Sequence, residues 1–376
     1  MLIMLNPRSA LFILIVIVSG FLCHAQNSIS GALENLPPGK LQLILEEDIN
    51  RKQSRLIAEI PFDEKGRFRY EAKLSPHIYS LKLNNNSSIM LAIDKDQQIV
   101  IKGNGTNAGS WKVTGSTDTK LLMDYEAFRK SSLERLVTAV RNNMRALKQK
   151  GVPDSDSSMI RLMDLEVVNY ALHRDELIDY IKTHMGTSVA VYPTSIRWNG
   201  EKNMLFLARL AKQFEAAHPR TAIAAKINEK VKVLKSTSIG GKAAAIRMPG
   251  KDGVTVSLSA VNAKFMLIDF WASWCAPCRQ ESALLADLYT RFKPQGFEIY
   301  GVSMDSAKEP WLKAIEKDRR TWINVSTFQG FETPASFDYA ITALPANVLI
   351  DKSGKVIARN VHGEELKNII EKLFSK

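Results

Sequence analysis

Short stretches of alternating apolar and polar residues characterise the chain from about residue 26 to 115. Such alternation is typical of β-strands that bury one face. The clearest strands are predicted at 41–45, 67–70, 79–83 and 98–101, with turn-forming residues between them. The pattern predicts a small β-rich domain, an antiparallel sheet or sandwich, in which we identify no catalytic constellation.

From about residue 116 to 235, apolar residues recur every three or four positions, as on one face of a helix. Helices are predicted at 121–140, 160–181, 202–217 and 221–234, and prolines separate them. His173, His184 and His218 have no partner at i+4 on the same helix face, so we assign none of them to a metal site.

A stretch rich in Gly and Ser at 236–253 is interpreted as a linker. Strands and helices then alternate. Strands are predicted near 254–258, 264–271, 297–303, 346–351 and 355–361, and helices near 276–293, 307–318 and 363–374. This order predicts an α/β domain at 254–376.

Residues 1–25 differ from the rest of the chain. Arg8 is their only charged residue, and an apolar run at 11–23 leads to a small-x-small sequence at 23–25. The run is short for a membrane span, so the pattern favours a secretory signal peptide. An uncleaved membrane anchor is the alternative, whereas a lipid anchor on Cys23 is disfavoured by the bulky Leu22 before it.

Composition narrows the class of protein. A length of 376 residues predicts two or three domains, and 45% apolar with 24% charged residues is typical of a soluble globular protein. The net charge of +12 would suit an anionic membrane or an acidic partner, but the charges are spread along helices, which favours a solvated surface. The densest basic run, at 226–251, contains no aromatic residue, so no nucleic-acid partner is expected.

The most informative motif is Trp274-Cys275-Ala276-Pro277-Cys278, directly after the predicted strand at 264–271. Two thiols at this spacing can close a small disulfide ring or be reduced together, so they can carry two electrons. Pro277 suits the first turn of a helix, which places Cys275 at a helix N-terminus, where a thiolate is favoured. A structural disulfide or half of a zinc site are the alternatives, but no second Cys pair and no nearby His completes a zinc site. We expect redox chemistry, with no metal and no other cofactor.

The stretch 269–278, together with 339–351 and the turn at 352–355, resembles the thioredoxin superfamily, and within it the exported TlpA/ResA-like thiol-disulfide oxidoreductases. The resemblance covers roughly residues 245–376 and implies a thioredoxin-like fold, with an insertion at 303–340. Residues 26–235 look like the β-rich DUF4369-type module and helical region that precede this domain in Bacteroidota proteins.

The resemblance implies a role for each matching residue. Cys275 would be the exposed attacking thiol and Cys278 the buried resolving thiol, and the two would form the catalytic disulfide. Asp269 matches a buried acid that relays a proton to or from Cys278. The alternative is a carboxylate satisfied by nearby N–H groups at a strand end.

A substrate-binding groove is also implied. Pro345 matches a cis-proline that faces the disulfide, and its neighbours Leu344 and Ala346 would hold a substrate strand through backbone groups. Trp274 and Pro277 would border this groove. Ala346 stands where Thr is usual, a departure that leaves the substrate preference open.

The expected function is reduction of disulfides in exported proteins, with a membrane electron donor, and the expected clients include apocytochromes c. The expected location is the periplasm or cell envelope of a Gram-negative bacterium. The alternatives are a disulfide oxidase or isomerase on the same fold, or a module that binds copper or haem.

Overall fold

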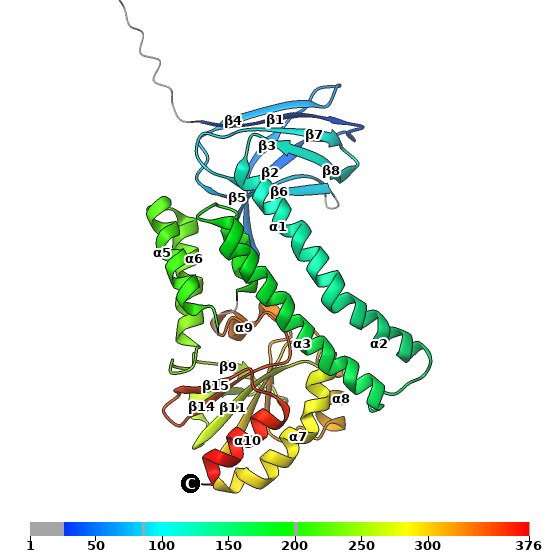
Figure 1. The fold of residues 1–376 in the computed structure, drawn as a ribbon, viewed down its shortest axis with the longest axis vertical. Coiled ribbons are helices and arrows are strands. Elements are labelled where there is room, and N and C mark those ends of the chain that lie inside the picture. The colour runs from blue at the N-terminus through cyan, green and yellow to red at the C-terminus, as the bar shows by residue number, and fades with distance from the viewer. Residues whose placement is uncertain (1–25, 85–86, 199–201, 376) are drawn as a thin grey trace, which may run out of the picture.

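The computed structural model describes residues 26–84, 87–198 and 202–375. A β-sandwich lies at one end of the long axis, an α/β domain at the other, and most helices lie between them (Figure 1). The predicted signal peptide at 1–25 lies outside the described residues. Within the described ranges, no helix combines the length and the apolar character needed to cross a bilayer.

The sandwich contains two four-stranded sheets around one apolar core, with strand orders β4-β1-β7-β8 and β3-β2-β5-β6. Every strand predicted here lies within an observed one, but the pattern does not predict β1, β3, β6 or β8. The expectation of an antiparallel sheet is wrong for β1 and β7, which pair in parallel. Edge strand β3 is largely exposed, so it lacks a regular apolar alternation. The bounds are β1 Asn27–Glu34, β2 Leu41–Asp48, β3 Gln53–Ile60, β4 Arg67–Ala72, β5 His77–Asn84, β6 Ser87–Ile93, β7 Gln98–Asn104 and β8 Asn107–Thr114.

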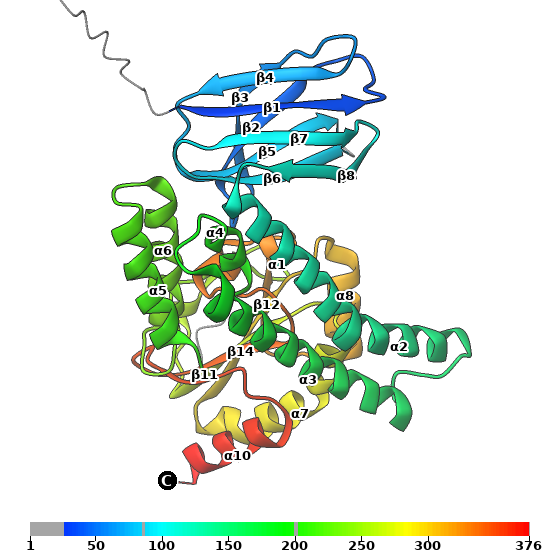
Figure 2. The same cartoon turned by 45° about the horizontal axis from the view of Figure 1, so that its top comes forward.

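The helical region packs against both other parts. Its first helix begins where Ser116 Oγ accepts the N–H of Thr119 at 3.0 Å, a typical N-cap. The core of this region includes Ala92 from the sandwich and Ala340 from the α/β domain. Helices α1 and α2, joined by a π-helical turn, run beside α3 (Figure 2). The bounds are α1 Thr117–Leu133, α2 Ala139–Gln149, α3 Ser157–Tyr180, α4 Val191–Thr194, α5 Met204–Ala217 and α6 Ala222–Ser236.

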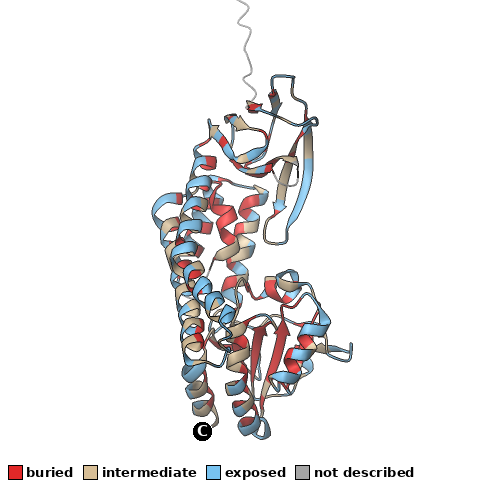
Figure 3. Ribbon diagram, turned by 90° about the vertical axis from the view of Figure 1, so that its right-hand side faces the viewer, coloured by how far each residue is buried: buried red, intermediate tan, exposed pale blue. Residues whose placement is uncertain are grey.

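The C-terminal domain has the predicted α/β thioredoxin-like fold, with a five-stranded mixed sheet in the order β13-β12-β11-β14-β15. Alternate residues of the central strand face opposite layers: Leu267 packs with α7 and α10, and Ile268 with α8 and α9. Buried residues fill this sheet (Figure 3). The main bounds are β9 Arg247–Pro249, β10 Thr255–Ser257, β11 Phe265–Trp271, α7 Ala276–Phe292, β12 Phe297–Ser303, α8 Lys308–Lys317, β13 Ile323–Ser326, α9 Pro334–Asp338, β14 Ala346–Asp351, β15 Val356–Arg359 and α10 Gly363–Phe374.

The segment 236–253, predicted as a linker, is bonded to the α/β domain. The Gly240 N–H donates to the Val356 carbonyl at 2.8 Å. Strand β9 pairs with β10, and Ile246 and Met248 are buried in the core of the domain. The Gly and Ser residues indicated flexibility, but the apolar residues among them bind the segment to the sheet.

Candidate active site

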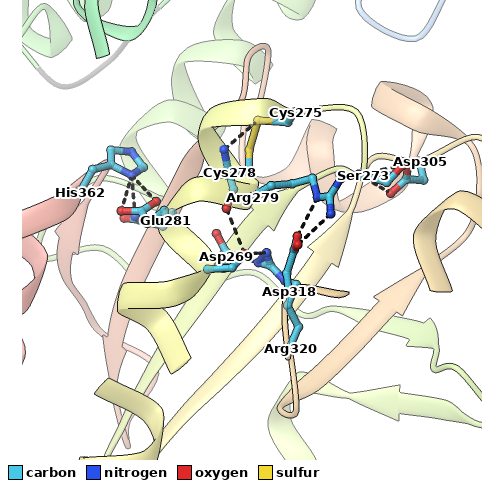
Figure 4. Close-up of a disulfide and its surroundings, with 12 residues drawn as sticks. Asp269, Ser273, Cys275, Cys278, Arg279, Glu281, Asp305, Asp318, Arg320 and His362 are labelled. Atoms are coloured by element: carbon cyan, nitrogen blue, oxygen red, sulfur yellow. Dashed lines mark hydrogen bonds and ion pairs between the residues drawn. A yellow bond between two sulfur atoms is a disulfide. The ribbon is translucent and has the colours of Figure 1, made fainter. Parts of the chain in front are cut away.

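A disulfide between Cys275 and Cys278 lies at the N-terminus of α7 (Figure 4). The buried strand β11 ends at Trp271, and Pro277 occupies the first turn of the helix, as the motif predicts. Cys275 is the N-cap residue, and its sulfur accepts the N–H of Cys278 at 3.3 Å. The N–H groups and the helix dipole therefore favour a thiolate at Cys275 once the disulfide is reduced.

Both sulfur-bearing residues are buried: Cys275 is 5% exposed and Cys278 is 3% exposed. The expectation that a helix N-terminus exposes Cys275 is therefore wrong for this chain. Cys275 instead lines a cavity of about 770 Å³ whose opposite wall comes from the helical region. Helix α3 packs against α7 and covers this end of the domain (Figures 1 and 2).

Beneath the disulfide, Asp269 on β11 is buried and accepts a hydrogen bond from Arg320. Arg320 also donates to Ser282 Oγ at 3.0 Å, and Ser282 donates to the Cys278 carbonyl at 3.2 Å. A hydrogen-bonded path therefore joins the buried carboxylate to the first turn of α7 (Figure 4).

Burial raises the pKa of Asp269, and the positive charge of Arg320 opposes that shift. Burial also lowers the pKa of Arg320, whose guanidinium carbon lies 3.7 Å from the ring centroid of Trp271 and 5.1 Å from that of Trp322. Because its proton affinity is increased, the carboxyl group of Asp269 can exchange a proton nearer to neutral pH than an exposed aspartate.

The loop before Cys275 is held by a second buried carboxylate, Asp305. It accepts a hydrogen bond from the Ser273 N–H at 3.0 Å and another from Ser303 Oγ at 2.7 Å. The Ser273 hydroxyl also donates to it. These bonds connect the loop before Cys275 to the end of β12.

The Leu344–Pro345 peptide is cis, as the resemblance implies. Trp274, Pro277 and Leu344 line the same cavity as Cys275. Pro345 and Ala346 line an adjoining cavity of about 190 Å³, which Leu344 also borders. The predicted groove residues therefore lie around two neighbouring cavities, and Asp269 lies in the interior beneath them.

Four residues that no sequence motif indicates also lie near the disulfide: Arg320, Asp305, Glu281 and His362 (Figure 4). Glu281 accepts hydrogen bonds from His362 Nδ1 at 2.9 Å and from the Gly363 N–H at 3.0 Å. It thus supports the start of α10 from the neighbouring helix α7. None of these residues belongs to a local motif, so only their position in the fold identifies them.

Comparison with known proteins supports the class of site that this geometry defines. The AhpC/TSA family matches residues 239–359. The thiol-disulfide oxidoreductase ResA of Bacillus thuringiensis subsp. konkukian is 30% identical over 138 residues, which cover 37% of this chain and 78% of the relative. ResA of Bacillus anthracis is 28% identical over 149 residues, with the same coverage of both chains.

Two solved structures are also similar. The thioredoxin domain of a thiol-disulfide oxidoreductase from Bacteroides vulgatus is 38% identical, covers 36% of this chain and 97% of its own, and has a TM-score of 0.35. A thiol-disulfide oxidoreductase from Bacteroides fragilis is 35% identical, covers 35% and 98%, and has a TM-score of 0.34.

The C-terminal domain is therefore a thioredoxin-like domain, and it carries the Cys275–Cys278 disulfide. The chain belongs to the ResA-like thiol-disulfide oxidoreductases and is an enzyme of that class. The comparisons concern the C-terminal third, so the likeness of residues 26–235 to a DUF4369-type module stays a prediction.

Proposed function

We propose that this enzyme is exported and reduces disulfides in proteins of the cell envelope. The observation that carries the proposal is the Cys275–Cys278 disulfide at the N-terminus of α7, next to a cavity large enough for a peptide segment. The name of the ResA relatives supports the class of reaction. The apolar pattern of residues 1–25 supports export.

In the proposed reaction the reduced pair supplies two electrons. The Cys275 thiolate attacks one sulfur of a client disulfide, which forms a mixed disulfide and releases the other client sulfur as a thiolate. Cys278 then loses its proton, for which Asp269 is the proposed acceptor, and attacks the sulfur of Cys275. The second client thiolate leaves, and the Cys275–Cys278 disulfide of this structure is formed.

Trp274, Pro277, Leu344, Pro345 and Ala346 are the proposed residues that hold the client beside this pair. A dithiol donor in the membrane would return two electrons to the oxidised enzyme. In this proposal the clients are exported proteins, such as apocytochromes c with oxidised haem-binding cysteines. The proposed location is the periplasm or envelope of a Gram-negative bacterium.

A redox titration against glutathione tests the direction of the reaction. A reductase requires a reduction potential well below that of a strong periplasmic oxidant, which is about −120 mV. A potential near that value would overturn the reductive direction. Insulin reduction by the wild-type enzyme, compared with the Cys275→Ser variant, tests whether the pair carries the activity.

A trapping experiment identifies the clients. In the Cys278→Ser variant the resolving thiol is absent, so a client attacked by Cys275 stays attached as a mixed disulfide. Mass spectrometry of such adducts from the cell envelope should find cysteine-containing exported proteins. The Cys275→Ser variant is the matched control and should capture none of them.

A further inference from the structure

The cavity over Cys275 has two walls that come from different parts of the chain. Trp274, Cys275, Pro277 and Leu344 form the wall of the thioredoxin-like domain. Helices α1, α2 and α3 form the opposite wall. Because Cys275 is only 5% exposed, a client disulfide can meet its sulfur only inside this cavity.

The wall formed by the helical region is strongly basic. Glu166 is the only carboxylate that lines this cavity among the described residues. The cations that line it are Arg129, Arg141, Arg145, Lys148 and Arg197. The helical wall therefore carries an excess of positive charge directly opposite the disulfide.

Three of these cations already have carboxylate partners. Arg141 bonds to Glu166 at 2.5 Å, whereas Arg129 and Lys148 pair with Glu126 and Asp154, which lie outside the cavity lining. These pairs reduce the positive charge that three of the five cations contribute. The charge that remains must come mainly from the other two.

Arg145 and Arg197 have no carboxylate partner among the described residues. Arg145 donates to the neutral side chain of Asn142 at 2.9 Å. Arg197, at the end of a short 3₁₀ turn, is half-buried, and its side chain makes no hydrogen bond or ion pair with any described residue. Both guanidinium groups are therefore available to an anionic group that enters the cavity.

His173 lines the same wall and lies within the field of these cations. Burial, together with the positive charges of Arg129 and Arg197 and against an opposing effect from Glu176, lowers its pKa to about 4. The positive groups thus act together across the cavity, where nearby charges are less screened than in bulk water.

We propose that the helical region forms the second wall of the client-binding site and selects an extended, acidic segment around the reacting cysteine. This inference rests on the proposed function, since the client must undergo the exchange described above. The opening between two walls suits an extended segment, because a rigid folded surface cannot bring its disulfide to a sulfur so deeply covered. Acidic side chains beside the client cysteine would bind Arg145 and Arg197.

The test uses the reduced full-length enzyme and two peptides of equal length, each with one intramolecular disulfide. In one peptide Glu residues flank the cysteines, and in the other Lys residues occupy the same positions. We expect kcat/KM to be about tenfold higher for the Glu peptide, and the difference to shrink at high salt. In the Arg145→Glu variant the two rates should approach each other.

Matched variants separate this effect from general changes in charge. Arg209→Glu makes the same change of charge at an exposed position of α5 that lines neither of the two cavities described, and it should keep the wild-type preference. Arg197→Gln should slow reduction of the Glu peptide, and Arg197→Lys should restore part of the rate. Equal rates for both peptides in the wild type, or equal effects of Arg145→Glu and Arg209→Glu, would overturn the inference.

The same experiment distinguishes two kinds of failure. If neither peptide is reduced, the proposed reductase function itself fails. If both are reduced at the same rate, the reductase function stands and only the acidic preference is wrong. A preference that is lost when anionic vesicles are added would instead assign the basic wall to a membrane surface, and would also overturn the inference.

Discussion

Arg320 donates a hydrogen bond to Asp269 in the interior beneath the disulfide, and its guanidinium lies between the rings of Trp271 and Trp322. The side chain of Arg320 is inaccessible to water, and that of Asp269 is only 4% exposed. The positive charge of Arg320 therefore stabilises the ionised form of Asp269, and the carboxylate in turn stabilises the buried guanidinium. Since Asp269 is the proposed proton acceptor for Cys278, the pair connects the stability of the fold to the redox site.

The pair should be strongly coupled in stability measurements. Arg320→Met leaves a buried carboxylate without its cation and should reduce the free energy of unfolding by about 3–5 kcal/mol. The double variant Asp269→Leu with Arg320→Met should lose much less than the sum of the single changes, because no unpaired charge remains. Urea unfolding of the oxidised proteins measures both quantities. If the losses of unfolding free energy are strictly additive, the two side chains are not energetically coupled.

The partly exposed ion pair between Arg279 and Asp318 provides a control near the same helix. Arg279 donates to Asp318 through two nitrogens at 2.7 Å, and the two side chains are 28% and 11% exposed, so both reach water. Water can therefore solvate either partner after the other is removed, and Asp318→Asn should cost about 1 kcal/mol or less.

The strand, the connection and the helix N-terminus that form the site can be predicted from the sequence, because the residues that determine them are neighbours in the chain. Pro277 and the apolar run before Cys275 are sufficient to predict a strand, a tight connection and a helix N-terminus. By contrast, Arg320 lies in the charged run 318–320, which by itself indicates an exposed turn. It is buried because it pairs with Asp269, which lies 51 positions away in the sequence. Nothing near Arg320 in the chain shows that partner.

The burial of Cys275 could not be predicted from the sequence either, because the residues that cover it are also distant in the chain. The wall that covers it comes from α1, α2 and α3, more than a hundred residues earlier in the chain. The periodicity predicts those helices but does not show which surface they cover. The sequence pattern does not predict strand β13 either, because its four residues lie in 303–340, the stretch interpreted as an insertion from the family resemblance.

Asp48 should be important for the attachment of the sandwich to α6. Its buried carboxylate accepts hydrogen bonds from Lys226 at 2.7 Å and from the backbone N–H of Arg51 at 3.1 Å. Burial alone would raise the pKa of Asp48, but these contacts outweigh it, so the pKa is lowered from 3.8. Asp48→Asn should cost about 2 kcal/mol of unfolding free energy at pH 7.

The sign of the pH effect follows from the lowered pKa of Asp48. The folded protein binds its proton less tightly than the unfolded chain, so the stabilisation is present above about pH 4 and is lost as the pH falls below it. The Asp48→Asn variant should therefore lose less stability between pH 4 and pH 2 than the wild type. Asp63→Asn, in an exposed turn of the same sandwich, is the matched control and should cost less at pH 7.

His173 should make the helical region sensitive to mild acid. It is buried, and Ser132 Oγ lies 2.8 Å from its Nδ1. Burial and the charges of nearby arginines lower its pKa from 6.5 to about 4. In the unfolded chain His173 therefore binds a proton below about pH 6.5, whereas in the folded protein it binds one only below about pH 4. Stability should fall by about 2 kcal/mol as the pH falls through this window.

The His173→Gln variant tests this dependence. It keeps a polar group beside Ser132 but cannot titrate, so its unfolding free energy should change less between pH 6.5 and pH 4. His184→Gln, at an exposed position beyond the end of α3, should keep the wild-type slope. If His173→Gln and the wild type show the same slope, His173 does not contribute to it.

Alkylation of the reduced enzyme should distinguish the two cysteines. Cys275 lines the cavity and lies at the helix N-terminus, whereas Cys278 lies one turn further along and does not line it. A thiol pKa one unit lower gives about tenfold more thiolate near neutral pH, so iodoacetamide should modify Cys275 about tenfold faster than Cys278. The Cys278→Ser and Cys275→Ser variants isolate each thiol, and mass spectrometry measures each rate. Faster modification of Cys278 would reverse the proposed order of attack, and it would assign the mixed disulfide with the client to the deeper sulfur.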